Sequence, residues 1–224
     1  MARETIYSPH LRVERKLFEE GFGLVGAIDE VGRGSVFGPC CVGLVVIDPG
    51  SGSFPAGLRD SKLLTASARG DLIEPLRRWV RAHAVGESSA AEIDEFGLTA
   101  ALRLAGHRAL EHIAPVPDVV LLDGSHNWLG AVATTLLGPP YPEVLVPPVR
   151  TRVKADVTCA AVAAASVFAK VYRDQLVEAM GRETPGYDLE HNKGYATPAH
   201  LAALRKLGPS AHHRVSWALP AIVR

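Results

Sequence analysis

Hydrophobic residues along the chain form short continuous runs, separated and followed by helix-spaced patterns. Three runs have the length of buried strands and a fourth is weaker: 24–29, 40–47, 119–122 and the short segment 84–88. Four other segments place apolar residues at the three- and four-residue spacing of an amphipathic helix: 11–20, 67–82, 98–113 and 198–207. The pattern therefore predicts a chain that mixes strands and helices.

Two further segments complete the expected order of elements. Residues 144–146 (VLV) lie between prolines, which cannot donate to a sheet, so they predict at best a short or edge strand. From Asp156 onward the pattern is helical and rich in small residues, which would let a helix pack closely on a sheet. The early strands come in meander order and the later ones alternate with helices. We therefore expect an α/β fold, a mixed sheet flanked by helices, in a single domain spanning 1–224.

Composition narrows the class of protein. The 224 residues include 24 basic and 24 acidic side chains, giving zero formal net charge, and 47% are hydrophobic. Such a chain can bury a core, which excludes a disordered, collagen-like or polycationic protein but allows a local basic groove. The N-terminal segment is too polar for a signal peptide, and the longest apolar run, 157–169, is shorter than the roughly 20 residues that span a bilayer. We expect a soluble, cytoplasmic protein without membrane contact.

Several familiar sites are disfavoured by their context. Gly21–Gly26 matches G-x-G-x-x-G, but a dinucleotide site needs a strand before that motif and a helix after it. Here a helical segment precedes and a strand follows, so we expect these glycines to turn the chain into the first strand. The histidines lack the cysteine or HExxH partners of a zinc site. Cys159 falls in the apolar helix and is expected to be buried and inert.

Four carboxylates stand where predicted elements end or begin. Asp29 and Glu30 end the first strand, Asp123 ends the strand VVLLD, and Asp156 opens the alanine-rich helix. Each has an ordinary explanation as an exposed strand end, a turn-forming Asp-Gly pair or a helix-capping aspartate. Brought together, however, they would form the oxygen cage that Mg²⁺ prefers, and two such ions about 4 Å apart can clamp a phosphodiester.

Basic residues accompany these acids. Gly32-Arg33-Gly34 follows the first pair and forms a loop whose backbone a ligand could approach closely. Arg150, Arg152, Lys154 and Asp156 alternate, so an extended chain would place them on one face. We interpret this stripe as a track for phosphates, with a solvated surface edge as the alternative.

The motifs in combination resemble a known family. They are GAIDEVGRGSVFGP, DSKLLTASAR, LLDG, KADVTCAAVAAASVFAKVYRD and NKGYATPAHLAAL, in that order between about 24 and 217. Together they resemble bacterial ribonuclease HII. The resemblance implies a ribonuclease H-like mixed five-stranded sheet flanked by helices over about 20–180, with a C-terminal helical portion over about 181–224.

The resemblance also implies site residues. The four catalytic, metal-binding carboxylates of the family fall on Asp29, Glu30, Asp123 and Asp156, which would hold two Mg²⁺ or Mn²⁺ ions. The loop that grips the ribonucleotide and its 2′-hydroxyl falls on Gly32, Arg33 and Gly34. Tyr195 would stack on the neighbouring deoxyribose, and Lys62 is a plausible phosphate contact. Two residues depart from the usual pattern: Asn192 replaces a histidine before KGY, and Trp217 replaces a phenylalanine near the C-terminus.

The implied reaction is metal-dependent hydrolysis of the phosphodiester on the 5′ side of a ribonucleotide, in an RNA–DNA hybrid or within duplex DNA, as in ribonucleotide excision repair. Its products would carry 3′-hydroxyl and 5′-phosphate ends. Two alternatives remain open on the sequence. One is a non-catalytic nucleic-acid-binding protein with a structural cation site, and the other is a related carboxylate nuclease that acts on branched DNA.

Overall fold

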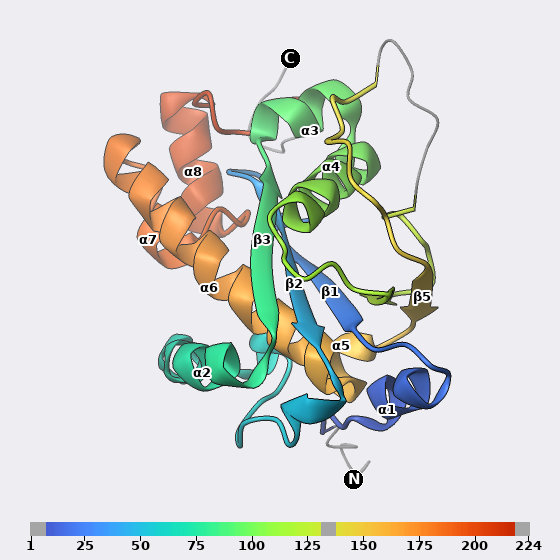
Figure 1. Ribbon diagram of the computed structural model, residues 1–224. Helices are drawn as coiled ribbons and strands as arrows, with labels where there is room; N and C mark the ends of the chain where they lie inside the picture. The colour runs from blue at the N-terminus through green and yellow to red at the C-terminus, as the bar shows by residue number, and fades with distance from the viewer. Residues whose placement is uncertain (1–7, 131–137, 218–224) are drawn as a thin grey trace, which may run out of the picture.

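Five strands form one mixed sheet in the computed structural model, which describes residues 8–130 and 138–217 (Figure 1). The strands are β1 Val25–Val31, β2 Cys40–Ile47, β3 Ala82–Ser88, β4 Val119–Asp123 and β5 Val149–Arg152. Their order across the sheet is β3-β2-β1-β4-β5. The first three pair as an antiparallel meander, whereas β4 is parallel to β1 and β5 is parallel to β4. The expected mixed five-stranded sheet is confirmed.

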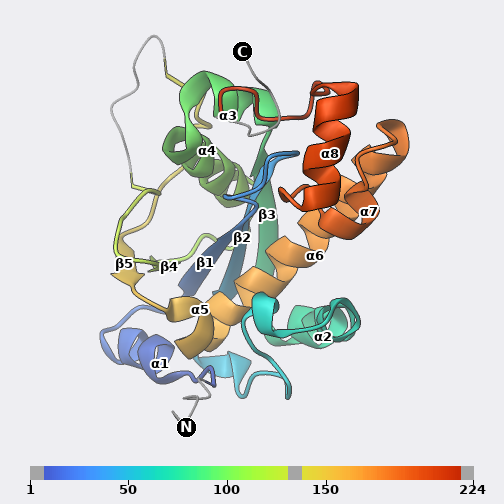
Figure 2. The ribbon, with the colours of Figure 1, turned by 180° about the vertical axis from the view of Figure 1, so that it is seen from behind.

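Helices cover both faces of this sheet. They are α1 Arg12–Glu19, α2 Ala66–Trp79, α3 Ala90–Phe96, α4 Leu98–Glu111, α5 Ala155–Thr158, α6 Ala160–Glu183, α7 Leu189–Asn192 and α8 Pro198–Leu207, with 3-10 turns at Pro49–Ser51 and Ser61–Leu63. α6 crosses the face seen in Figure 2, and α4 packs on the opposite face. α7 and α8 lie at the far end of α6 from α5, where they form the expected C-terminal helical portion. Within the described residues, no helix is long and apolar enough to span a bilayer.

β2 shows why a buried strand appears in the sequence as a continuous apolar run. All of its residues are buried, because Val42 and Leu44 point toward α4 while Val45 and Ile47 point toward α6. A Cβ on Gly43 would lie 2.3 Å from the carbonyl oxygen of Ala165 in α6. The helix therefore approaches the sheet at backbone distance, which explains its alanine-rich sequence.

The structure corrects the expected fifth strand. Residues 144–146 form no strand, and β5 begins only at Val149. Pro147 and Pro148 cannot donate N–H groups, so Val149 is the first residue after them that can supply a full ladder pair. Pro148 still accepts a hydrogen bond from Val120 N–H at 2.9 Å.

The long helix expected from Asp156 is interrupted at Cys159. That residue is extended and bridges to His10, whose N–H donates to Thr158 O and whose carbonyl accepts from Ala160 N–H. Glu14 of α1 then accepts a hydrogen bond from Ala161 N–H at 2.9 Å, so the N-terminal segment caps α6. Cys159 is buried, as expected, and burial raises the pKa of its thiol to about 11.

Other element boundaries also differ. α2 ends at Trp79 rather than near 82, and β3 starts two residues before the expected strand. α3 has no counterpart in the expected elements; Gly97, with φ of 79°, separates it from α4. The glycine motif at Gly21–Gly26 does form the turn from α1 into β1, with Gly23 and Leu24 N–H donating to Asp118.

A buried histidine pair holds the C-terminal portion together. His200 Nε2 and His213 Nε2 lie 3.1 Å apart and pack against Phe37. His200 Nδ1 lies 2.9 Å from Tyr195 O, and Ser210 N–H donates to His213 Nδ1 at 2.9 Å. These partners require neutral rings, with the proton on Nδ1 of His200 and on Nε2 of His213. Burial, then the neighbouring His200, lowers the pKa of His213 to about 4.

The free energy of unfolding should therefore contain a His213 contribution that is lost on acidification. A histidine in the unfolded chain protonates near pH 6.5, so between about pH 6.5 and 4 the unfolded state binds the extra proton and is favoured. Imidazole NMR titration should show His213 neutral down to about pH 5. The urea concentration at the midpoint of unfolding should fall as the pH is lowered from about 6.5 to 4. Exposed His191, whose pKa is raised by its hydrogen bond to Asp188, is the internal control and should protonate above pH 6.5. Titration of His213 together with an unperturbed histidine would contradict the buried pair.

Candidate active site

Strand pairing brings two of the predicted acids together. In the parallel pair of β1 and β4, Ile28 is in register with Leu122, so the next residues, Asp29 and Asp123, lie at one level. Alternation along each strand directs both side chains toward the face covered by α5 and α6. Asp123 Oδ1 then accepts hydrogen bonds from Ala155 N–H at 2.7 Å and from Asp156 N–H at 3.4 Å. By capping α5 in this way, Asp123 places Asp156 beside it.

The electrostatics of Asp29 connect all four acids. Asp29 is 4% exposed, and burial raises its carboxyl pKa well above the ordinary value. Repulsion from Glu30, and less from Asp123 and Asp156, raises this pKa further, whereas Lys62 opposes the shift. The four predicted carboxylates therefore share one electrostatic environment, although they come from three separate segments.

These acids are gathered but not in mutual contact. In the described part of the chain, the only three His, Cys, Asp or Glu ligand atoms lying within 4.8 Å of one another belong to Asp188, Glu190 and His191. That group is exposed at α7, at the other end of α6 from Asp156, and His191 is already hydrogen-bonded to Asp188. We assign no ligand to it.

Two of the predicted substrate-binding side chains are paired with predicted metal ligands. Lys62 Nζ lies 3.2 Å from Asp156 Oδ2, and Arg33 Nη1 lies 2.9 Å from Glu30 Oε1. Burial disfavours the charged form of Lys62, but Asp29, Asp60 and Asp156 outweigh burial and raise its pKa. Both basic side chains are more than half exposed, so solvent weakens these ion pairs and a phosphate could replace the carboxylate partner.

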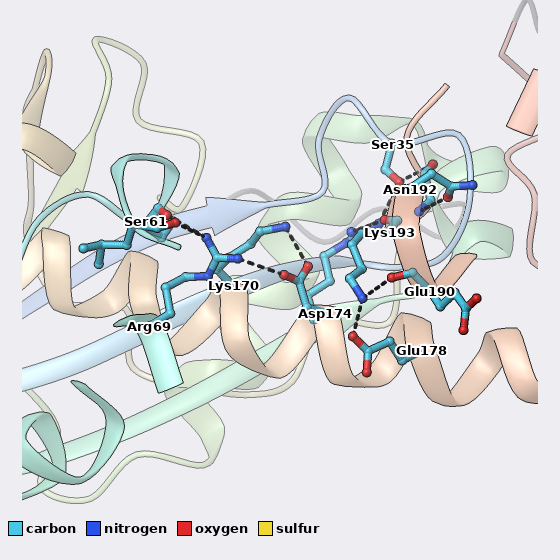
Figure 3. A network of polar contacts seen from close by, with 12 residues as sticks. Ser35, Ser61, Arg69, Lys170, Asp174, Glu178, Glu190, Asn192 and Lys193 are labelled. Carbon is cyan, nitrogen blue, oxygen red and sulfur yellow. Dashed lines mark hydrogen bonds and ion pairs between the residues drawn. The ribbon is translucent and has the colours of Figure 1, made fainter. Parts of the chain in front are cut away.

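The segment that carries Lys62 is anchored on α6. Ser61 N–H donates to Ser166 Oγ at 2.9 Å, and Ser61 O accepts from Arg69 Nη1 at 2.9 Å (Figure 3). Arg69 also lies 3.5 Å from Asp174, which forms an ion pair with Lys170. A row of polar contacts thus follows α6 from the Lys62 segment toward the C-terminal portion.

The carboxylates themselves fit a hard cation. Glu30 Oε2 is buried and has no hydrogen-bond partner among the described residues. Asp29 is also buried, with 4% of the residue exposed. Buried carboxylate oxygens without donors are costly unless they are paired with a cation, and divalent Mg²⁺ or Mn²⁺ takes oxygen ligands of this type.

The two glycines of the glycine-arginine-glycine loop have different surroundings. Gly32 has φ of 86°, and a Cβ there would lie 2.2 Å from Arg173 Nε. Around Gly34, by contrast, no heavy atom lies within 4 Å of where a Cβ would stand. Gly32 is therefore required by packing, whereas Gly34 leaves its backbone open to a ligand.

Tyr195 joins this loop through the turn that precedes it. Val36 N–H and Phe37 N–H both donate to Gly194 O, at 3.0 and 3.2 Å. Asn192 forms the inside of the turn, since its Oδ1 accepts from Gly194 N–H at 2.8 Å. The half-buried Tyr195 ring lies 5.6 Å from the Arg173 guanidinium carbon. The departure at Asn192 therefore sits inside the turn that positions Tyr195.

Arg150 and Arg152 line a hollow rather than continue into one stripe. The hollow, of about 550 Å³, lies between α1 and β5 and is also lined by Arg12 and Lys16. Alternation stops at Arg152, because Lys154 adopts φ of 60° immediately before α5. The extended track expected through Lys154 to Asp156 is therefore wrong, although a concave basic surface exists.

Sequence reasoning did not identify Arg173 and Arg214, two arginines that the structure buries completely. A signal for Arg173 was present. It follows Ala165 and Ala169 at intervals of four, and Val177 comes four residues later, so Arg173 lies on the buried face of α6. No comparable periodicity marks Arg214, which lies outside the helices.

Comparisons with known proteins identify the family to which the chain belongs. The ribonuclease HII family model matches residues 26–220. The chain is 46% identical over 214 residues to ribonuclease HII of Streptomyces griseus subsp. griseus, a match covering 94% of this chain and 84% of that protein. The chain belongs to the ribonuclease HII family. It is accordingly a ribonuclease H, a hydrolase.

Solved structures support the family's fold. The crystal structure of ribonuclease H2 from Pyrococcus horikoshii is similar with a TM-score of 0.66 and 25% identity, covering 88% of this chain and 94% of that one. The ribonuclease HII in a complex with PCNA from Archaeoglobus fulgidus has the same TM-score and identity, covering 88% of this chain and 96% of that one. The ribonuclease H-like fold expected from the motifs is confirmed.

The two loop glycines should respond differently to alanine. Gly34→Ala should change the free energy of unfolding by less than about 1 kcal/mol, because the new Cβ meets open space, while cleavage of a ribonucleotide substrate falls. Gly32→Ala should destabilise the fold itself, because its Cβ would overlap Arg173 in a left-handed backbone. Thermal unfolding and cleavage assays on both variants check this. Equal destabilisation by the two substitutions would contradict the open surface at Gly34.

Proposed function

We propose that the chain is a metal-dependent endonuclease that hydrolyses the O3′–P bond on the 5′ side of a ribonucleotide, in RNA–DNA hybrids or within duplex DNA. Its products carry 3′-hydroxyl and 5′-phosphate ends. The observation that carries this proposal is the gathering of Asp29, Glu30, Asp123 and Asp156 in one electrostatic environment, in a chain of the ribonuclease HII family. The proposal treats residues 1–224 as one catalytic domain.

The acids are proposed to hold two Mg²⁺ or Mn²⁺ ions. Such ions, when bound, lower the pKa of a coordinated water and neutralise charge on the scissile phosphate. The chain supplies the binding surface, since Asp29 is 4% exposed, Glu30 Oε2 is buried without a hydrogen-bond partner among the described residues, and Asp123 fixes the position of Asp156. Lys62 and Arg33 balance part of the acidic charge and are exposed enough to turn toward phosphate oxygens.

Recognition of the ribonucleotide is proposed to use the loop and the tyrosine turn. The 2′-hydroxyl distinguishes RNA from DNA, and the open backbone at Gly34 can approach it closely. Tyr195 would pack on the next sugar and favour a deoxyribose, because an added hydroxyl would crowd the ring. The hydrogen bonds from Val36 and Phe37 to Gly194 hold the loop and the Tyr195 turn side by side.

Affinity for the nucleic acid is proposed to come from the basic hollow. Arg12, Lys16, Arg150 and Arg152 would contact phosphates there, in a chain whose overall charge is zero. Such contacts position a duplex without reading its sequence, and they weaken as the salt concentration rises.

Asp29→Asn should abolish cleavage while leaving the fold and hybrid binding intact. The amide is uncharged and similar in size, so it removes a proposed metal ligand without introducing a buried charge. The assay is cleavage of an end-labelled duplex that contains one ribonucleotide, with Mg²⁺ and with a chelator. Asp71→Asn, at an exposed position on α2, is the matched control and should retain full activity.

Retained turnover in Asp29→Asn would overturn the ligand assignment. Binding without chelator-sensitive cleavage by the unaltered protein would favour the non-catalytic alternative. Cleavage of branched DNA that contains no 2′-hydroxyl would favour the other nuclease.

Tyr195→Ala should reduce cleavage at a single embedded ribonucleotide more than cleavage of a long hybrid, because only the former presents a deoxyribose to the ring. Tyr195→Phe keeps the ring and should preserve the preference. The measurement is kcat/KM on both substrates for the two variants. Equal losses on both substrates in Tyr195→Ala would show that Tyr195 does not read the junction.

A further inference from the structure

Two fully buried arginines lie behind the proposed ribonucleotide-reading loop. Arg173 comes from α6 and Arg214 follows α8, and both side chains are 0% exposed. Among the described residues, no carboxylate oxygen lies within the 4.0 Å of an ion pair with either one. Buried charge without a charged partner is costly, so these guanidinium groups must make strong contacts of another kind.

Arg173 binds the segment that follows the loop and the turn that carries Tyr195. Its Nε donates to Pro39 O at 2.8 Å, and its Nη2 donates to Ser35 Oγ at 2.7 Å and Phe37 O at 3.0 Å. Its Nη1 donates to Lys193 O at 2.9 Å. Figure 3 shows Lys193 above α6, where its amine pairs with Glu178. One side chain thus joins two segments that are far apart in the sequence.

Arg214 binds the loop itself. Its Nη1 donates to Arg33 O at 3.0 Å, while Nε and Nη2 both donate to Gly38 O, at 3.2 and 3.0 Å. Trp217 covers the guanidinium, with its ring centre 4.9 Å from the guanidinium carbon. The aromatic residue that departs from the family pattern therefore packs on the side chain that holds the loop.

The direction of these carbonyls decides the direction of the loop amides. In a planar trans peptide the C=O and N–H groups point in opposite directions. Because Arg214 binds Arg33 O, the N–H of Gly34 points away from Arg214. Gly32 O accepts from Ser35 N–H, so the N–H of Arg33 points away from Ser35. Neither amide donates to any described group, so both N–H donors remain available to a ligand.

We infer that Arg173 and Arg214 are positioning residues for ribonucleotide recognition. Arg214 orients the Arg33–Gly34 peptide so that the Gly34 amide faces the substrate, and Arg173 fixes the distance between that loop and the Tyr195 turn. The inference rests on the proposed function. Both arginines act through backbone carbonyls rather than by touching substrate, and together they set the selectivity for a ribonucleotide over DNA.

Arg214→Lys tests this directly. Lysine keeps the positive charge, but one amine cannot reproduce the separate guanidinium contacts to Arg33 O and Gly38 O. In an Asp29→Asn background, which prevents turnover, we would measure Kd for a duplex with one ribonucleotide and for the same duplex made only of DNA. The selectivity ratio, which is Kd for the all-DNA duplex divided by Kd for the ribonucleotide duplex, should fall about tenfold, equivalent to about 1.4 kcal/mol. Affinity for the all-DNA duplex should stay unchanged.

Arg108→Lys is the matched control. Arg108 also donates to a carbonyl, Glu87 O, and pairs with Glu92, but it belongs to α4 on the opposite face of the sheet from α6. Its substitution should leave the selectivity ratio unchanged even if it lowers the melting temperature. A folded Arg214→Lys protein with unchanged selectivity would overturn the role of Arg214.

Ser35→Ala provides a milder second variant if Arg214→Lys fails to fold. It removes the hydroxyl that accepts from Arg173 and that also donates to Phe37 O and Gly194 O. The ratio should again fall, whereas an unchanged ratio would overturn the role of Arg173. The parent Asp29→Asn protein distinguishes failure of the proposed function from failure of the inference. A parent without preference for the ribonucleotide would overturn the proposed function and the inference with it. A parent that discriminates, with variants that discriminate equally, would overturn the inference alone.

Discussion

The close contact of α6 with the central strands is the constraint on which the site depends. The helix backbone reaches the sheet at Gly43, one strand away from Asp29, with which Gly43 is in register. At its start, α6 follows the turn that carries Asp156, and further along it carries Arg173. Because the helix is rigid and seated at backbone distance, it fixes the acids and the substrate loop relative to one another.

Charge is balanced locally within this frame. Asp29 is deeply buried beside other acids, so its carboxyl pKa is raised, and the neighbouring Glu30 Oε2 has no hydrogen-bond partner among the described residues. Lys62 and Arg33 each pair with one acid from the exposed side. Behind the loop the opposite situation holds, since two buried guanidinium groups donate to neutral oxygens and form no ion pair with a described carboxylate. The site therefore combines excess acid where cations would bind with buried positive charge beneath the open amides.

The C-terminal portion completes the site rather than merely extending the chain. Gly194 O accepts from Val36 and Phe37, and the buried histidine pair packs on Phe37. These contacts tie the Tyr195 turn to the loop through neutral hydrogen bonds and ring packing. Such bonds lose little to salt, which suits a surface that must stay in place while it binds a charged duplex.

The sequence by itself located most of the elements and singled out the four candidate acids. Apolar runs located four of the five strands, and carboxylates at the ends of predicted elements, together with the family's motifs, singled out Asp29, Glu30, Asp123 and Asp156. These features are local, because the periodicity of apolar residues and the order of the motifs depend on residues close together in the sequence. The start of β5, the break at Cys159, the ion pairs of Lys62 and Arg33, and the buried positions of Arg173 and Arg214 were decided only by tertiary structure. Each depends on a partner distant in the chain, such as β4, His10, Asp156 or the carbonyls of the loop, and spacing along the sequence carries no information about such a partner.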